Sequence, residues 1–269
     1  MGGENVKTYE GKALPELAGL LGEDVCTFSM LSRIVKGRCT KTVTDHQRVI
    51  MCLSVRPFPV WVWVAPDAGR EELERVWAVL RAEFPPEEGN SYNVGLPLSR
   101  VMLESDPSLR VTVGLMAYHC HEAIPPKKTP GGRMSPVRAE EIDLAAAWYS
   151  AMHKECALNE DIAPDAAREA VMQYAHRQAM FFWRDEDGAP AAMCGVDEDE
   201  NGAYVTHVYT PVHARRKGYA GNLVYTVSAS QLERGKTPML YTDADYAASN
   251  ACYTQIGYNL QGELRTLAR

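Results

Sequence analysis

The chain has 269 residues, of which 46% are hydrophobic and 23% charged, and its formal net charge is −7. This is the composition of a globular protein with room for one large domain or two of ordinary size, and the acidic balance argues against a nucleic-acid partner, which would need a broad basic face. Because the sequence has no apolar run of about 18 residues and no apolar core near its N-terminus, it predicts neither a membrane span nor a signal peptide.

The cysteines favour a reduced, cytoplasmic protein. All seven are scattered, their number is odd, and none forms a CxxC pair. Reduced and mostly buried thiols explain this best. In the triplet around Cys120, at most His119 and His121 could face one ion from a strand, and no companion motif supplies further ligands, so we expect no metal.

Residues 1–123 are expected to form one mixed α/β unit. Strand propensity and helical periodicity predict its elements, although glycines interrupt the first two helices. Helices are expected at 11–22, at 26–35, from near 67 to 84 and at 97–103, and strands at 48–55, 60–64 and 109–118. Residues 124–133 then contain three prolines, two adjacent glycines and three cations, a composition that excludes a helix or a central strand and predicts a domain boundary.

Residues 134–269 are expected to form a second α/β domain. Apolar periodicity predicts two helices, the second with a proline in its first turn, followed by three strands and further helix–strand alternation. Strands are expected at 134–138, 179–183, 189–196, 204–209, 239–242 and from 257 onward, and helices at 140–156, 164–178, from the basic turn after 209 to about 233, and at 249–256.

The stretch from Tyr204 to Gly221 predicts a strand, a tight turn and a helix. Arg215, Arg216 and Lys217 stand where the helix begins, at the positive end of its dipole, which normally favours acidic side chains. Little side-chain bulk covers the free N–H groups of the first turn, so the turn is suited to phosphate. A solvated basic turn is the alternative interpretation.

The pattern Arg215-x-x-Gly218-x-Ala220 after a strand ending in Val-Tyr-Thr-Pro resembles the acetyl-CoA pyrophosphate loop of the GCN5-related N-acetyltransferases. A second stretch, Leu240 to Tyr258, is similar to the closing motif of that family, with Tyr246 and Ala247 in place of the usual Asn-Pro. The resemblance covers the second half of the chain. It implies the acyl-CoA N-acyltransferase fold for residues 134–269 and contacts to CoA from Val208, Tyr209, Thr210, Arg215, Arg216, Lys217, Gly218, Tyr219, Ala220, Gly221 and Asn250.

The resemblance also implies a reaction. Acetyl-CoA would give its acetyl group directly to a primary amine, Tyr253 would protonate the departing thiolate, and a backbone N–H at Val208 or Tyr209 would stabilise the oxyanion. The base stays open. His207 lies on the key strand, but strand alternation brings either Thr206 with Val208 or His207 with Tyr209 to the cleft. Glu155 and Glu160 stand where the family contacts its acceptor, although solvated carboxylates are the simpler interpretation.

Residues 1–123 echo the second domain's strand, loop and helix without its phosphate chemistry. Glu71, Glu72 and Glu74 occupy the start of the equivalent helix and would repel a pyrophosphate. We therefore expect two tandem acetyltransferase-like domains, of which the first shapes the acceptor site or mediates dimer contacts without binding CoA. The expected protein is a cytoplasmic monomer or homodimer that acts on a small-molecule or peptide amine. A non-catalytic acyl-CoA-binding sensor and a scaffold that binds no CoA remain as alternatives.

Overall fold

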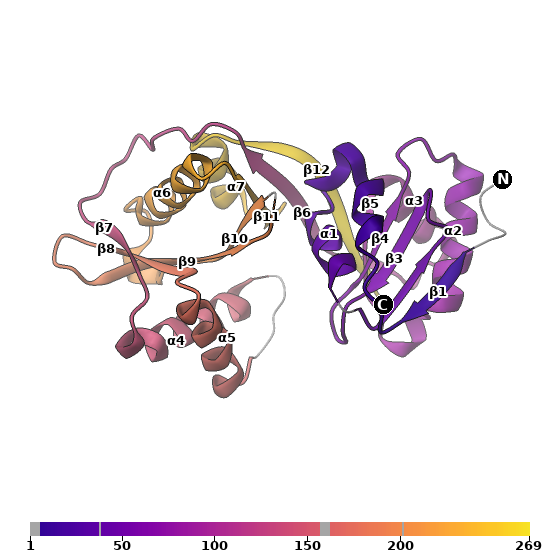
Figure 1. Ribbon diagram of the computed structural model, residues 1–269, viewed down its shortest axis with the longest axis horizontal. Coiled ribbons are helices and arrows are strands. Elements are labelled where there is room, and N and C mark those ends of the chain that lie inside the picture. The colour runs from indigo at the N-terminus through magenta and orange to yellow at the C-terminus, as the bar shows by residue number, and fades with distance from the viewer. Residues whose placement is uncertain (1–5, 38, 157–161, 201) are drawn as a thin grey trace. The chain divides into compact units, whose positions relative to one another are not determined.

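The computed structural model describes residues 6–37, 39–156, 162–200 and 202–269 (Figure 1). The chain forms two compact units. Unit 1 comprises Met1–Ala117, Asp243–Asp245 and Gln261–Arg269, and unit 2 comprises Tyr118–Thr242 and Tyr246–Leu260. The segment 124–133, expected to separate two domains, thus lies within unit 2, whereas residues after Leu260 lie in unit 1.

The first half of the chain runs strand, two helical segments, three strands, helix, strand, helix and strand, with one extra 3-10 turn. The elements are β1 (Lys7–Glu10), η1 (Pro15–Val25), α1 (Ser29–Lys36), β2 (Lys41–Thr44), β3 (Val49–Leu53), β4 (Val60–Val64), α2 (Arg70–Glu83), η2 (Pro86–Glu88), β5 (Tyr92–Gly95), α3 (Leu96–Ser105) and β6 (Arg110–Cys120).

The second half repeats this order, apart from two short 3-10 turns, and so confirms the order expected from the sequence. Its elements are β7 (Arg133–Pro136), η3 (Ala139–Glu141), α4 (Ile142–Glu155), α5 (Pro164–His176), β8 (Met180–Arg184), β9 (Pro190–Glu198), β10 (Gly202–Tyr209), η4 (Val212–Ala214), α6 (Tyr219–Glu233), β11 (Thr237–Asp243), α7 (Ala247–Gln255) and β12 (Tyr258–Ala268).

The closing strand of each half, β6 or β12, has residues in both units. In unit 1 the strand order is β1, β2, β3, β4, β5 and then β12, whose residues 264–267 pair antiparallel with residues 92–95 of β5. In unit 2 the order is β11, β10, β9, β8 and β7; β6, which pairs with β11, has residues 110–117 in unit 1 and residues 118–120 in unit 2. Each unit contains one parallel pair of strands joined through a helix, namely β4 with β5 and β10 with β11.

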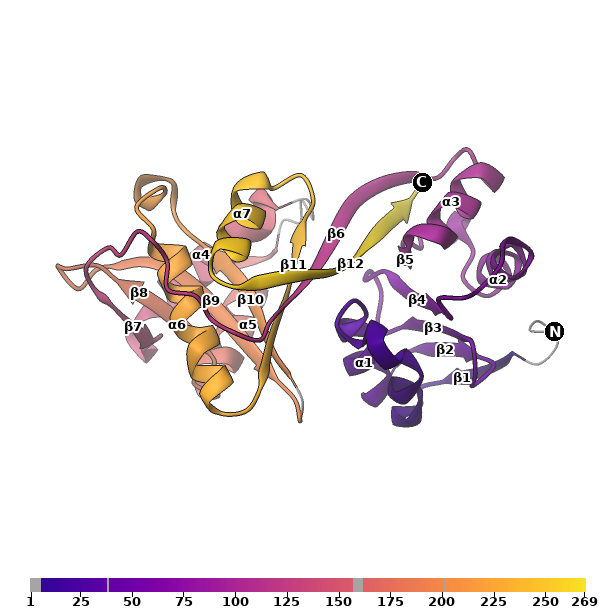
Figure 2. The same ribbon diagram turned by 90° about the horizontal axis from the view of Figure 1, so that it is seen from above.

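Helices cover both faces of each sheet. In unit 1, η1 and α1 lie on one face and α2 and α3 on the other; in unit 2, α4 and α5 lie on one face and α6 on the other (Figures 1 and 2). Alternation along the strands supplies the apolar side chains for both layers. In unit 1, Trp77 and Leu80 of α2 pack into a core with Val62 of β4, and in unit 2, Ala145 of α4 packs into a core with Phe182 of β8. This is the mixed α/β architecture predicted from the sequence.

Three strands and one helix type differ from the sequence-based expectation. The strands β1, β2 and β5 were not predicted, because each has only four residues and β5 lies in a Gly/Asn-rich stretch typical of a turn. The segment expected as a helix at 11–22 is a 3-10 helix, and Gly22 breaks its regular backbone. Within the described ranges, no helix combines the length and the apolar character that a bilayer crossing requires.

Candidate active site

A cavity of about 470 Å³ in unit 2 lies at the C-terminal end of β10. Its wall is formed by the end of α4, the end of β10 with the loop that follows, the first turn of α6, and α7. The residues that line it are Met152, Glu155, Cys156, Val208, Tyr209, Thr210, Ala214, Arg215, Arg216, Gly218, Tyr219, Ala220, Gly221, Tyr246, Ala248, Ser249, Cys252 and Tyr253. Ten of the twelve residues predicted for the site are among them. Lys217 and Asn250 are not.

A bulge in β10 opens the strand toward this cavity. His207 has a left-handed backbone (φ 52°), and the register with β9 shifts between Thr206 and Tyr209. β10 pairs with β11 in parallel over residues Gly202 to Tyr204. Because a bulge interrupts the two-residue alternation of a strand, consecutive residues, Val208 and Tyr209, both line the cavity. Neither alternative derived from regular alternation is therefore correct.

The same bulge places His207 away from the cavity, in a buried polar cluster. Its Nε2 lies 3.2 Å from Tyr174 Oη, which donates a hydrogen bond to Asp197 (2.9 Å), and its ring packs against those of Tyr149 and His153. Burial, together with the neighbouring His153, lowers the pKa of His207 to about 4. His207 is thus neutral at pH 7 and absent from the cavity wall, which agrees with the core interpretation and leaves the base to another group.

The loop before α6 has the local geometry expected of an anion cradle. Gly218 is the N-cap of α6 with φ 92°, Arg216 is also left-handed (φ 64°), and the first turn of α6 contains no acidic residue. A glycine cap offers no side chain to the first N–H groups of the helix, which therefore remain available to a ligand. Arg215 Nε donates to the carbonyl oxygen of Thr210 at 2.8 Å.

The proline-rich segment 124–133 packs directly on this loop. Lys128 donates from its ammonium group to the carbonyl oxygen of Arg216, and Asn222 Nδ2 donates to the carbonyl oxygen of Lys128 at 2.7 Å. A Cβ at position 218 would lie 3.2 Å from the carbonyl oxygen of Lys128, closer than an ordinary contact. The segment interpreted as a domain boundary is therefore part of the scaffold of the loop. Composition predicted its irregular backbone but gave no signal for these tertiary contacts.

Tyr253 lines the cavity from α7. Its side chain is 8% exposed, and burial raises the pKa of its phenol, so the phenol keeps its proton at neutral pH. Across the described part of the chain, no residue makes a hydrogen bond to its hydroxyl, whereas the nearby Tyr258 hydroxyl pairs with Ser228 Oγ at 2.7 Å. The Tyr253 hydroxyl therefore keeps a proton that is not donated to any described residue.

The Ile-Gly-Tyr end of the closing motif serves packing. Gly257 has φ 100°, and a Cβ there would come within 2.0 Å of the carbonyl oxygen of Glu122. The neighbouring backbone of Ile256 accepts a hydrogen bond from Ile124 N at 3.0 Å. These contacts hold the start of segment 124–133 against the end of α7.

Glu155 and Tyr246 join α4 to the rest of the cavity. Tyr246, one of the two departures from the family motif, donates from its hydroxyl to the backbone carbonyl of Glu155 at 2.6 Å. The Glu155 carboxylate accepts a hydrogen bond from Tyr209 Oη (3.0 Å) and forms an ion pair with Arg215. Glu160, the other carboxylate considered from the sequence, lies outside the described residues. Among the residues that the structure describes, no cluster of three His, Cys, Asp or Glu side chains is arranged to hold a metal ion.

Comparisons with known proteins agree with this geometry. Residues 185–266 match the family model described as FR47-like protein. A GCN5-related N-acetyltransferase from Sphaerobacter thermophilus superposes with a TM-score of 0.69 and 12% identity, over 99% of this chain and 96% of that chain. One from Kribbella flavida gives 0.63 and 17%, over 92% and 95%.

The chain has the GCN5-related N-acetyltransferase fold. A GNAT-family acetyltransferase from Colwellia psychrerythraea also matches, with a TM-score of 0.61 and 11% identity, over 98% of both chains. No curated protein matches the chain significantly in sequence. Because the three structural matches span almost the whole chain, the likeness includes unit 1 as well as the segment found by the family model.

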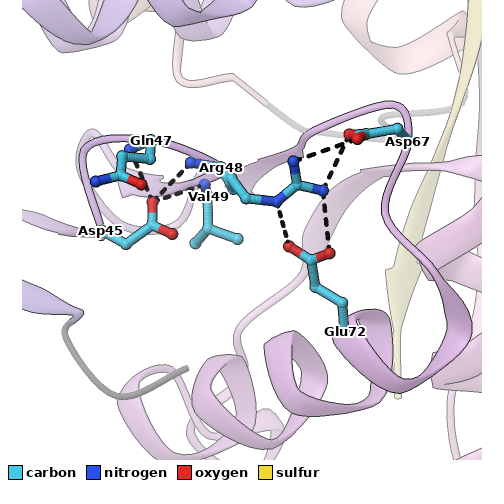
Figure 3. A network of polar contacts seen from close by, with 6 residues as sticks. All are labelled: Asp45, Gln47, Arg48, Val49, Asp67 and Glu72. Carbon is cyan, nitrogen blue, oxygen red and sulfur yellow. Dashed lines mark hydrogen bonds and ion pairs between the residues drawn. The ribbon is translucent and has the colours of Figure 1, made fainter. Parts of the chain in front are cut away.

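Unit 1 also has a cavity, but the charges around it differ from those of the unit 2 cavity. A cavity of about 280 Å³ lies at the ends of β4 and β5, and its described lining contains the carboxylates Asp24 and Glu263 but no lysine or arginine. At the start of α2, Glu72 and Asp67 hold the guanidinium of Arg48, with contacts of 2.7 and 2.9 Å (Figure 3). A protein side chain thus supplies the charge partner of these carboxylates, and the absence of diphosphate binding in unit 1 stays a prediction.

Proposed function

We propose that the chain is an acetyl-CoA-dependent N-acetyltransferase that transfers an acetyl group to a primary amine by direct attack. The observation that carries this proposal is that the glycine-capped basic loop and Tyr253 line the same cavity. The loop would hold the diphosphate of CoA through backbone N–H groups and cations. The acyl thioester would then lie between the end of β10 and Tyr253.

The residues of the cavity suit each step of an acyl transfer. The amine nitrogen attacks the thioester carbon, and the backbone N–H groups of Val208 and Tyr209 are the nearest candidates to stabilise the oxyanion. The carbon–sulfur bond then breaks and the thiolate leaves, with the Tyr253 hydroxyl as its hydrogen-bond donor. The amine loses its proton to Glu155 or to water at the mouth of the cavity.

Release of free thiol from acetyl-CoA in the presence of an amine panel tests the proposal. The panel should contain polyamines, amino acids, aminoglycosides and peptides, and calorimetric titration of CoA should accompany it. We expect CoA binding and turnover with at least one amine class. Binding without turnover over the whole panel would favour the non-catalytic sensor, and the absence of both binding and a thermal shift at millimolar acetyl-CoA would favour a scaffold.

A further inference from the structure

Arg215 is the first residue of the loop proposed to bind a diphosphate, yet its guanidinium is already engaged. It forms an ion pair with the Glu155 carboxylate, and this contact raises the pKa of the guanidinium. Both side chains are 42% exposed, and both line the same cavity. The pair therefore forms at the mouth of the site, where a ligand can reach it.

The setting of Glu155 favours a cation beside it. Glu155 is the last residue of α4, and the C-terminus of a helix carries partial negative charge. The Tyr209 hydroxyl donates to the carboxylate, and the Tyr246 hydroxyl donates to the backbone carbonyl of the same residue. Two tyrosines thus fix the position of Glu155 whether or not Arg215 is its partner.

We propose that Glu155 is an exchangeable counter-ion, which holds Arg215 until a CoA diphosphate takes the guanidinium and then receives the ammonium group of the acceptor amine. This inference rests on the proposed function. A guanidinium can make two parallel hydrogen bonds to a carboxylate or to a phosphate, so Arg215 can exchange one partner for the other. The exchange leaves a carboxylate that still accepts the Tyr209 hydroxyl, on a residue whose backbone carbonyl accepts the Tyr246 hydroxyl, in the cavity where the amine must approach the thioester.

The exchange couples donor and acceptor in both directions. Binding of the diphosphate removes the cation that competes with the amine for Glu155, and binding of the amine removes the anion that competes with the diphosphate for Arg215. By linkage, each ligand should increase the affinity for the other by the same factor. In the free protein, Arg215 is correspondingly less available to inorganic anions, because Glu155 neutralises its charge.

The decisive variant is Glu155→Gln, which keeps the size of the side chain and removes its charge. Because exposed ion pairs contribute little, we expect CoA to bind roughly two- to fivefold more tightly to this variant by calorimetry at low salt. In the Arg215→Gln background the same substitution should not tighten CoA binding. Glu198→Gln is the matched control, since Glu198 pairs with Arg234 on the surface of unit 2 outside this cavity and should leave CoA affinity unchanged.

Kinetics separate the exchange from a merely structural role. In Glu155→Gln the KM for acetyl-CoA should fall while the KM for the amine rises by roughly fivefold, whereas a distorted site would raise both. If the wild-type protein binds CoA but Glu155→Gln binds it equally or less tightly, the inference is wrong and the proposed function stands. If the wild-type protein binds no CoA, the proposed function fails and the inference fails with it.

Discussion

Replacement of Tyr253 by phenylalanine is the most direct test of the proposed chemistry. Tyr253 lines the cavity, and the substitution removes its hydroxyl, which makes no hydrogen bond to any described residue. The fold should therefore tolerate it. Because burial raises the pKa of this phenol, full proton transfer to a thiolate is disfavoured, and a hydrogen bond to the developing charge is the contribution we expect.

The expected loss follows from that assignment. A hydrogen bond to a charged group contributes about 1.5–3 kcal/mol, which corresponds to roughly a 10- to 150-fold decrease in kcat. A complete general-acid role would lie higher, at about 10²- to 10⁴-fold. The assay is thiol release with the best amine of the panel under saturating acetyl-CoA, accompanied by calorimetric measurement of CoA affinity, which should not change.

Tyr258→Phe provides the matched control. It removes a hydroxyl from a neighbouring buried tyrosine that does pair with Ser228 and does not line the cavity. Its free energy of unfolding should fall by about 1–3 kcal/mol, while turnover per folded molecule stays at the wild-type level. A Tyr253→Phe variant that retains turnover within twofold of wild type would refute the assignment of Tyr253.

Three further predictions concern the scaffold. Lys128→Met removes the ammonium contact to the carbonyl of Arg216. CoA affinity measured by calorimetry should therefore fall roughly threefold, while kcat at saturation stays unchanged. Unchanged affinity would show that segment 124–133 does not position the loop. Glu141→Gln breaks the ion pair with Arg184, whose side chains are 14% and 6% exposed, and should lower the free energy of unfolding by about 3 kcal/mol at pH 7. Since Arg184 lowers the pKa of Glu141 in the folded state, this stabilisation is present above about pH 4.3 and is lost as the pH falls through the folded pKa, so denaturant titrations of variant and wild type should converge in acid. Arg48→Met removes the partner of Glu72 and Asp67 in unit 1 and should lower the unfolding midpoint without changing CoA affinity. A gain or loss of CoA binding would contradict the prediction that unit 1 binds no diphosphate.

The predictable part of the site is local in sequence. The strand, basic turn and helix around Arg215 follow each other within about twenty residues, and turn chemistry and helical periodicity specify them without tertiary information. The position of Tyr253 on the cavity wall agrees with the family resemblance. These features depend on short-range geometry, so the sequence alone could indicate them.

The missing parts depend on distant contacts. A bulge at His207, which has a left-handed backbone, changes which side chains of β10 face the cavity. The regular two-residue alternation of a strand does not predict such a bulge. The Glu155–Arg215 pair and the Lys128 contact each join residues at least 60 positions apart. Strand β5 was not predicted because its stability comes from ladders with β4 and β12, rather than from its own four residues.

The pairing of β12 with β5 has a consequence for how this chain can fold during synthesis. Unit 1 contains residues 261–269, so its sheet lacks a neighbour for β5 until the ribosome has made nearly every other residue described here. Until then, the first half exposes an unpaired parallel-sheet edge, which can pair with a second nascent chain. Expression of residues 1–117 alone should therefore yield aggregated or chaperone-bound material, and adding a peptide of residues 258–269 in trans should recover some of it as folded protein.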